Sequence, residues 1–398
     1  MKKLLILGGT YFQVPAIKYA KSQGYHVITC DYLPGNPGHK WADEYYNVST
    51  TDKEKVLELA RSLHVDGILC FASDPAAPTA AYVSEKLGLP GNPYDKIVLL
   101  GEKHLWREFL RKNGFRVPKA KPYLDVREVN VAEWRFPVMI KPVDSSGSKG
   151  ISKVSDKNEL AGAFHYALSY SRLKIVLIEE YIEKVGPQIG GDGFFGTSRL
   201  DFVCYGDQVV DESINGYVPC GMKFPSLLSS VLKKNITDDI ERAIQLSGLK
   251  NLSFNLEVMV DKNDHVYLME LGPRNGGNCI PEVIQNYTGV NMVALAVEAS
   301  LGNTIPVTTG SNEHVFAYYA LHSHIPGIYK GYCLSGHFKG RVNNSYIFLN
   351  EGDKIDVFLG SNQTIGILLL EFDTREDMDA FFETPSTYVE VMVEQGNA

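Results

Sequence analysis

The sequence predicts a mixed fold, with an α/β domain at its N-terminus followed by α+β segments, on three observations. About the first hundred residues alternate continuous apolar strands, such as KLLILGG from Lys3, with helical segments, which is typical of a doubly wound parallel sheet. Beyond about residue 115, strands and hairpins dominate and helices become fewer. A chain of 398 residues is long enough for about two or three domains.

The N-terminal elements follow one another in a regular order. We expect strands at KLLILGG, YHVITCD and VDGILCFA, a first helix over about 12–23, and further helices at DKEKVLELARSL and PAAPTAAYVSEKLGL. Gly24 favours the end of the first helix, because glycine readily adopts the left-handed conformation found there. The PGNP sequence then breaks the chain, and we place the first domain over residues 1–95.

The rest of the chain divides near residue 302. A helix at EKHLWREFLRKNG carries an apolar stripe and is followed by the strands FPVMIKPV, KIVLIEEYI, SFNLEVMV and HVYLMEL. From about Asn303, the strands HVFAYYALHSH and TIGILLLEF precede a last helix near Arg375–Glu383. We therefore expect a central domain over residues 96–302 and a C-terminal, strand-rich one over residues 303–398.

Composition and charge exclude several classes of protein. The net charge of −8 argues against a nucleic-acid partner, which favours a basic surface. The six cysteines form no CxxC pair, which is typical of reduced thiols rather than of disulfides or a zinc site. No apolar run approaches the roughly 20 residues that cross a bilayer, and two glycines end the apolar start of the chain too early for a secretion signal. We expect a cytoplasmic protein without a membrane partner.

The opening LLILGGTYFQ raises the question of a dinucleotide site. In the G-x-G-x-x-G fingerprint, glycines let the backbone approach a pyrophosphate. Here bulky residues follow Gly8 and Gly9, and Gln13 replaces the last glycine, so an NAD oxidoreductase with Asp31 as its ribose acid is disfavoured. A helix N-terminus can still hold an anionic group of a substrate. Gly8 and Gly9, together with Asp74 in SDPAAPT, are therefore candidate substrate residues.

The stretch FPVMIKPVDSSGSKGISKV is the most informative in the chain. Lys141 lies on an apolar strand, where a lysine is costly unless it meets an anion. In the loop that follows, small residues let backbone N–H groups and hydroxyls surround phosphates. The alternative is a solvated hairpin turn beside an edge-strand lysine. The candidate phosphate-binding residues of this loop are Ser146, Gly147, Ser148, Lys149 and Gly150.

The strand VLIEEYIEK ends in acids. Such a segment can join two lobes and offer backbone groups to a purine, and its acids Glu179, Glu180 and Glu183 can alternatively be solvated side chains at a strand end. These residues are candidates for nucleotide binding.

A predicted hairpin brings two further acids together. SFNLEVMV and HVYLMEL flank the turn DKND, and alternation places Phe254, Leu256, Val258 and Val260 on one face and Asn255 and Glu257 on the other. Glu270 ends the partner strand. Two carboxylates that face one cleft are hard oxygen ligands suited to Mg²⁺. The alternative is two unrelated surface acids.

Taken in order, these motifs resemble those of the ATP-grasp enzymes. The resemblance rests on a lysine early in a helix (Lys103), Lys141 before a Gly/Ser-rich loop, the EEYI hinge, and an acid hairpin that closes with E-x-x-P-R at Arg274. It is closest to the branch that contains carbamoyl phosphate synthetase, biotin carboxylase and the purine-pathway carboxylate–amine ligases. It implies a Rossmann-like domain before the ATP-grasp domain, an ATP-grasp domain of two lobes with a lid lobe at about 115–180, and a C-terminal β-rich subdomain.

The resemblance also implies roles for individual residues. Lys103 and Lys141 would be cationic ligands of the ATP phosphates, and the loop at 144–150 would be the lid over them. The backbone of Glu180 and Ile182 would meet adenine. Glu257 and Glu270 would bind Mg²⁺, with Mn²⁺ as a substitute, and Arg274 would steady the transferred phosphate or the acyl-phosphate, which makes Arg274 and Lys141 the implied catalytic residues.

The sequence departs from the family pattern at two places. The family often has an asparagine two residues after the second metal acid, where this chain has Gly272, so Asn275 or Asn278 would substitute as a metal ligand. The ribose acid expected after the hinge aligns with Gln188, so either Gln188 or Glu183 would contact the ribose.

The implied function is a Mg²⁺-dependent ligase that uses ATP to activate a small-molecule carboxylate as an acyl-phosphate for attack by an amine. A bicarbonate-using carboxylase would share all the ATP residues, and a non-catalytic ATP-binding module is a further alternative. The sequence is compatible with a homodimer. His322 and His324 share one strand face, where they can ligate a metal or have a structural or substrate-contacting role, and the second is more frequent for such pairs.

Overall fold

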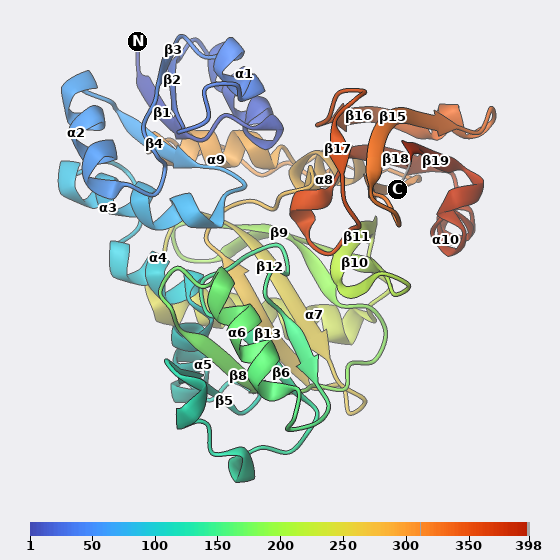
Figure 1. The fold of residues 1–398 in the computed structure, drawn as a ribbon. Coiled ribbons are helices and arrows are strands. Elements are labelled where there is room, and N and C mark those ends of the chain that lie inside the picture. The colour runs from blue at the N-terminus through green and yellow to red at the C-terminus, as the bar shows by residue number, and fades with distance from the viewer. Residues whose placement is uncertain (311, 396–398) are drawn as a thin grey trace.

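The N-terminal strands form a parallel sheet, as predicted. The computed structural model describes residues 1–310 and 312–395. Its first sheet has the order β3-β2-β1-β4, and every pair in it is parallel. Its strands are β1 (Lys3–Leu7), β2 (His26–Cys30), β3 (Glu44–Tyr46) and β4 (Gly67–Cys70). The side chains of Leu4–Leu7 are completely buried, because helices cover both faces of the sheet (Figure 1).

The helices of this half agree with the sequence, with one addition. They are α1 (Val14–Ser22), α2 (Lys53–Leu63), α3 (Ala77–Leu87), α4 (Tyr94–Gly101) and α5 (Lys103–Lys112). Gly24 follows the first helix with φ +77°, which confirms its predicted role as a helix end. The additional helix is α4, which the break at PGNP did not indicate. It begins after Pro93 and buries Ile97 and Leu100 in the central core.

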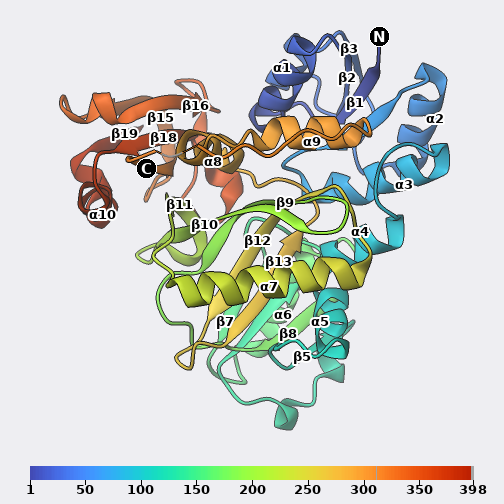
Figure 2. The ribbon, with the colours of Figure 1, turned by 180° about the vertical axis from the view of Figure 1, so that it is seen from behind.

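One helix from the middle of the chain completes the N-terminal unit. α9 (Met292–Ser300) packs against α1 and β4, and its residues Val293 and Val297 share a core with Leu4 and Ile6. Both ribbon views show this helix beside the N-terminal sheet (Figures 1 and 2). Seven of its nine residues are buried, so it has no polar face whose period would have predicted it.

The predicted lid lobe is a small antiparallel sheet. Its strand order is β5-β8-β6-β7, and helix α6 packs against it (Figure 1). The elements are β5 (Ala120–Tyr123), β6 (Val138–Pro142), β7 (Ser152–Val154), α6 (Leu160–Tyr170) and β8 (Val176–Glu180).

The second lobe is part of an eight-stranded antiparallel sheet. Its order is β13-β12-β9-β10-β11-β14-β18-β16. The central strands are β9 (Ile189–Phe195), β10 (Leu200–Asp211), β11 (Asn215–Phe224), β12 (Leu252–Val260) and β13 (Val266–Gly272). Helix α7 (Ser230–Ser247) crosses one face of this sheet (Figure 2), and α8 (Ile280–Thr288) packs near β14.

The C-terminal segment extends this same sheet, because β11 pairs with β14 across the predicted boundary near residue 302. Because one sheet spans this boundary, the division of the chain into domains over residues 96–302 and 303–398 stays a prediction. The remaining elements are β14 (Val315–Leu321), β15 (Gly327–Leu334), β16 (Val342–Ile347), β17 (Lys354–Ile355), β18 (Gly366–Phe372), α10 (Arg375–Glu383) and β19 (Val389–Glu394).

Short 3₁₀ turns join many of these elements, at Tyr11–Gln13, Pro37–Trp41, Asp74–Ala76, Val126–Glu128, Val131–Glu133, Phe338–Arg341, Ser361–Gln363 and Pro385–Thr387. Within residues 1–310 and 312–395, no helix combines the length and the apolar character that crossing a membrane requires.

Candidate active site

Two acids lie side by side on the hairpin of β12 and β13. Glu257 pairs directly with Glu270 across the antiparallel strands, and the burial of β12 alternates as predicted, so that its apolar residues face the core. Both acids line a cleft between the two lobes. Burial and the neighbouring charge of Glu270 raise the pKa of Glu257. Two carboxylates held this close favour a cation between them, and their oxygens are the ligands that Mg²⁺ prefers.

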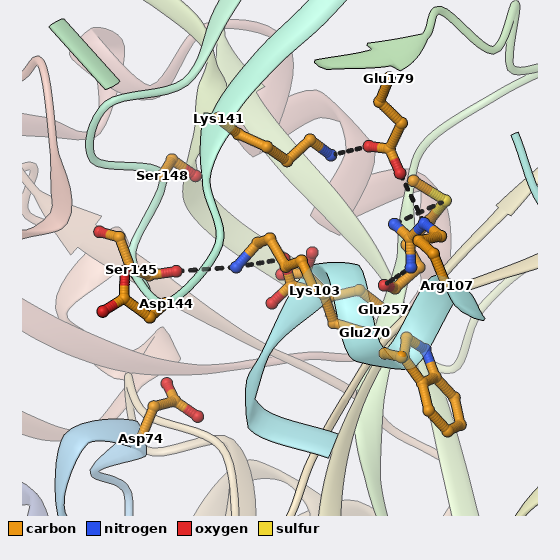
Figure 3. Close-up of polar contacts among 12 residues, drawn as sticks. Asp74, Lys103, Arg107, Lys141, Asp144, Ser145, Ser148, Glu179, Glu257 and Glu270 are labelled. Carbon is orange, nitrogen blue, oxygen red and sulfur yellow. Dashed lines mark hydrogen bonds and ion pairs between the residues drawn. The ribbon is translucent and has the colours of Figure 1, made fainter. Parts of the chain in front are cut away.

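Lys103 connects this hairpin to the predicted phosphate loop. It is the first residue of α5, and its ammonium nitrogen lies 3.2 Å from Glu270 Oε1. The same nitrogen donates a hydrogen bond of 2.8 Å to the carbonyl of Ser145 (Figure 3). The side chain is buried, so its charge is held against Glu270 at the edge of the acid pair. Lys103 therefore lies where it could contact an anion between the loop and the acids.

Lys141 is positioned by a buried ion-pair network. Glu179, which is only 1% exposed, forms ion pairs with Lys141 and with Arg107 (Figure 3). Burial would raise the pKa of Glu179, but the charges of Arg107 and Lys141 outweigh it and lower the pKa to about 2. Arg107 also donates a hydrogen bond of 2.6 Å to the carbonyl of Met269 on β13. Glu179 was predicted to bind the nucleotide, and these contacts favour a role in positioning Lys141.

Sequence reasoning missed Arg107. The signal that could have found it is its spacing, because Lys103 and Arg107 are four residues apart on α5 and therefore project from the same face. Both are buried, which is unusual for cations unless acids meet them.

The loop at 144–150 is anchored at both ends. The carboxylate of Asp144 accepts hydrogen bonds from the Ser171 hydroxyl at 2.8 Å and from the backbone N–H of Leu173 at 3.0 Å. The hydroxyl of Ser148 donates to the carbonyl of Tyr217 at 2.6 Å. Gly147 has φ +65°, and a Cβ atom there would collide with the Ser361 hydroxyl. The predicted lid loop thus touches the β10–β11 hairpin and the C-terminal segment.

The predicted hinge lines the cleft next to apolar side chains. Glu180, Ile182 and Gln188 line the cleft. Its apolar lining comes from both lobes and includes Met139, Ile151, Met259 and Met269. Glu183 instead lines a neighbouring groove together with Asp261 and Tyr267. Gln188 donates a hydrogen bond of 2.7 Å to Glu257 Oε2, so its side chain reaches the acid pair. Of the two candidates for ribose contact, Gln188 is the one that faces the cleft.

Two cleft residues were not predicted from the sequence. Lys184 and Gln208 line the same cleft as the acid pair. Gln208 lies at a distance of 3.5 Å from Glu257 Oε1 as a hydrogen-bond donor. Burial lowers the pKa of Lys184. Gln208 belongs to no motif, so only the fold brings it to the site, whereas Lys184 is the last residue of VLIEEYIEK, in which the acids are the candidates that the sequence indicates.

Arg274 and Asp74 meet from distant parts of the chain. They form an ion pair that joins the end of β13 to the turn Asp74–Ala76 after β4. Burial would raise the pKa of Asp74, but the guanidinium of Arg274 outweighs it and the pKa is lowered. A Cβ atom at Gly272 would lie 3.3 Å from Asp74 Oδ1. The glycine that this chain has in place of the asparagine of the family pattern therefore leaves room for the Arg274–Asp74 pair.

The two asparagines considered as substitutes have other contacts. Asn275 is 1% exposed and donates a hydrogen bond of 3.1 Å to Asp192 Oδ2, which also accepts from the backbone N–H of Gly276 at 2.9 Å. Asn278 lies 3.4 Å from the Tyr318 hydroxyl as a donor. Burial raises the pKa of Asp192. Asp192 thus holds the turn after β13, and a metal-binding role for Asn275 stays a prediction.

The glycine turn at Gly8 and Gly9 has a packing explanation. Gly8 has φ +104°, and a Cβ atom at Gly9 would collide with the ring of His39. Thr10 and Gln13 form a capping box, in which the Gln13 side chain accepts from the Thr10 N–H at 2.9 Å. The Thr10 N–H, which could otherwise bind an anionic group of a substrate, is therefore already hydrogen-bonded inside the turn. A substrate role for these glycines stays a prediction.

Asp31 is also satisfied locally. Its carboxylate accepts hydrogen bonds from the N–H of Leu33 at 3.0 Å and from the Asn36 amide at 2.9 Å. These hydrogen bonds indicate that Asp31 shapes its own loop. They give no support to a dinucleotide site at the start of the chain.

Comparisons with known proteins identify relatives of this chain. The family model described as "ATP-grasp domain" matches residues 134–282. A formate-dependent phosphoribosylglycinamide formyltransferase of Bacteroides thetaiotaomicron is 30% identical over 46% of this chain and 48% of its own length. The enzyme of the same name from Prochlorococcus marinus strain NATL1A is 26% identical over 77% of this chain and 78% of its own. The first alignment thus spans about half of that relative.

A solved structure shares the fold along the whole chain. The L-amino acid ligase of Bacillus licheniformis has a TM-score of 0.83 and 18% identity, with 99% of both chains covered. Residues 134–282 of the chain form an ATP-grasp domain, which confirms the resemblance inferred from the motifs. The predicted fold class is confirmed as well.

Proposed function

We propose that the protein is a Mg²⁺-dependent ligase that uses ATP to join a small-molecule carboxylate to an amine, with release of ADP and phosphate. The observation that carries the proposal is one cleft lined by the acids Glu257 and Glu270 and the buried Lys141, with the buried Lys103 in contact with Glu270. Acids suited to a divalent cation and lysines suited to phosphates are the groups that phosphoryl transfer requires.

The proposed reaction has two steps. An oxygen of the carboxylate attacks the γ-phosphorus of ATP, which gives an acyl-phosphate and ADP. The amine then attacks the acyl carbon, the C–O bond breaks, and phosphate leaves. Lys103 and Lys141 neutralise the phosphate charge, and Arg274 holds the transferred group on the side of Asp74. Glu257 and Glu270 would hold Mg²⁺, which when bound neutralises charge on the phosphates.

The loop at 144–150 protects the intermediate in this proposal. Its contacts with Tyr217 and with the segment at Ser361 close one side of the cleft. A closed loop excludes water that would hydrolyse the acyl-phosphate. The hinge at Glu180 and Ile182 supplies an adenine site against apolar walls. The similar proteins include a formate-dependent formyltransferase and an L-amino acid ligase, which supports a carboxylate as the activated group.

The test is release of ADP from Mg·ATP in the presence of pooled small carboxylates and pooled amines, each pool also offered alone. We expect ADP release that requires one carboxylate and one amine together. ADP release that instead requires bicarbonate would assign the protein to the carboxylases, and nucleotide binding without ADP release from any pool would leave only an ATP-binding module.

The expected preference for Mg·ATP over NADH gives a simpler prediction. Mg·ATP should raise the melting temperature, because a ligand that binds only the native state at about 100 times its Kd adds roughly 2.7 kcal/mol to the free energy of unfolding. NADH at the same concentration should leave the melting temperature unchanged. Differential scanning fluorimetry measures both, and a shift with NADH alone would contradict the site described above.

A further inference from the structure

A second cluster of potential ligands lies away from the proposed nucleotide cleft. Asp211 ends β10, and His322 and His324 directly follow β14. One donor atom of each residue lies within 4.8 Å of the others. Asp211 Oδ2 is 3.3 Å from His322 Nε2 and 3.0 Å from His324 Nε2. Two imidazole nitrogens and one carboxylate oxygen thus converge on one point.

Neighbouring groups orient two of these ligands. His322 Nδ1 lies 2.7 Å from the carbonyl of Ala320. A carbonyl only accepts, so Nδ1 carries the proton, and in the neutral ring Nε2 presents its lone pair to the cluster. Asp211 Oδ1 accepts from the Ser213 hydroxyl at 2.6 Å and from its N–H at 3.0 Å. Oδ2 is therefore the carboxylate oxygen left to face the histidines.

Two of the three donor–donor separations in this cluster suit a transition-metal site, and the third lies within 4.8 Å. A backbone carbonyl on the second ring nitrogen is the contact that fixes metal-ligating histidines in the correct tautomer. Donors about 2.0–2.2 Å from a tetrahedral Zn²⁺ lie about 3.4 Å from one another, close to the two distances above. Without a cation or an added proton, the lone pair of His322 Nε2 would face a carboxylate oxygen, which is unfavourable.

We propose that Asp211, His322 and His324 bind a divalent transition-metal ion of the Zn²⁺ class, at a site separate from the predicted Mg²⁺ site. Imidazole nitrogen suits Zn²⁺ and its neighbours, whereas Mg²⁺ prefers oxygen ligands. The side chain of His322 is 3% exposed and that of His324 is 60% exposed. The ion therefore has a buried ligand to hold it and an open side from which it can arrive.

The position of the site gives it a structural role. The ion would join the end of β10 to the end of β14. The ring of Phe358 packs against the ring of His322 with centroids 4.6 Å apart, and the Phe358 N–H donates to the Ser323 carbonyl at 3.1 Å. Three residues further along, Ser361 touches Gly147 of the lid loop. The metal would therefore fix the segments against which the lid loop rests.

The experiment titrates the full chain, freed of metals with a chelator, with Zn²⁺ against a chromophoric chelator. Excess Mg²⁺ is present to occupy oxygen-rich sites. We expect the parent to bind one Zn²⁺ per chain, and Co²⁺ to give visible absorption bands typical of nitrogen ligation.

Both His324→Ala and Asp211→Asn should weaken Zn²⁺ binding at least about tenfold. His324 is exposed, and the amide oxygen introduced by Asp211→Asn can still accept from Ser213, so both variants should fold.

The matched control is His314→Ala. His314 also lies beside acids, with its Nε2 at 3.9 Å from Asp373, but among residues 1–310 and 312–395 it belongs to no group of three converging ligand atoms. This variant should bind Zn²⁺ like the parent. Absence of Zn²⁺ binding by the parent, or equal binding by the parent and by both site variants, would overturn the proposal and leave only the polar contacts of Asp211 with the two histidines.

Discussion

Glu270→Gln is expected to reduce turnover by about a hundred- to a thousandfold while the protein stays folded. The substitution keeps the shape of the side chain but removes the charge that lies next to Glu257 and 3.2 Å from Lys103. Loss of one group that stabilises charge in a transition state typically costs about 3–4 kcal/mol of activation free energy. ADP release under saturating Mg·ATP, with the substrates found by the pool assay, measures the effect.

Two variants separate chemistry from binding in this test. Lys141→Ala should weaken nucleotide binding itself, because it removes a charge held against the phosphates. Glu108→Gln, which alters an exposed acid paired with Lys112 on α5, should turn over like the parent. If Glu270→Gln also turns over like the parent, Glu270 is not a metal ligand.

Glu179→Gln should lower the free energy of unfolding by about 3–5 kcal/mol. The loss is large because Arg107 and Lys141 are both buried and would face each other without a negative partner. Urea unfolding of parent and variant, followed by circular dichroism, gives the difference. Glu133→Gln is the matched control, because Glu133 pairs with Lys121 at 3.3 Å on the surface and an exposed pair contributes little.

The difference in stability between the parent and Glu179→Gln should also depend on pH. The pKa of Glu179 is about 2 in the folded protein, below its unfolded value of about 4.3. Its contribution to stability is therefore complete above the unfolded pKa and is lost as the pH falls toward 2. The stability difference between parent and Glu179→Gln should shrink over that range. A difference that is already small at pH 7 would show that the network does not hold Lys141.

Local patterns predicted the elements on which the site is built. The alternation in SFNLEVMV placed Glu257 on the polar face of its strand, and the turn DKND predicted the hairpin with the strand that ends at Glu270. The direct pairing of the two acids also depends on a register shift between Glu257 and Val258, which no local signal indicated. The continuous apolar run before Gly8 predicted a buried parallel strand. These signals are strong because period and turn chemistry act within a few residues.

The missed features depend on contacts between distant segments. Arg107 reads as a surface residue of an amphipathic helix until the fold brings Glu179 against it. Gln208 reaches Glu257 only because β10 lies near β12 in the sheet. Asp192 is surrounded by glycines in IGGDGFF, where no periodic signal marks it as the buried centre of a polar network. Side-chain partners of this kind are set by tertiary packing, which the local sequence does not encode.

The central claim is that a carboxylate is activated as an acyl-phosphate, and oxygen transfer tests it most directly. The carboxylate that supports ADP release is supplied with ¹⁸O in both oxygens, together with Mg·ATP and the amine, and the released phosphate is analysed by mass spectrometry. Because the carboxylate oxygen bonds to the γ-phosphorus and stays there when the C–O bond breaks, the account predicts one ¹⁸O atom in each phosphate. Phosphate without ¹⁸O would show that water attacks ATP directly, and would contradict the account.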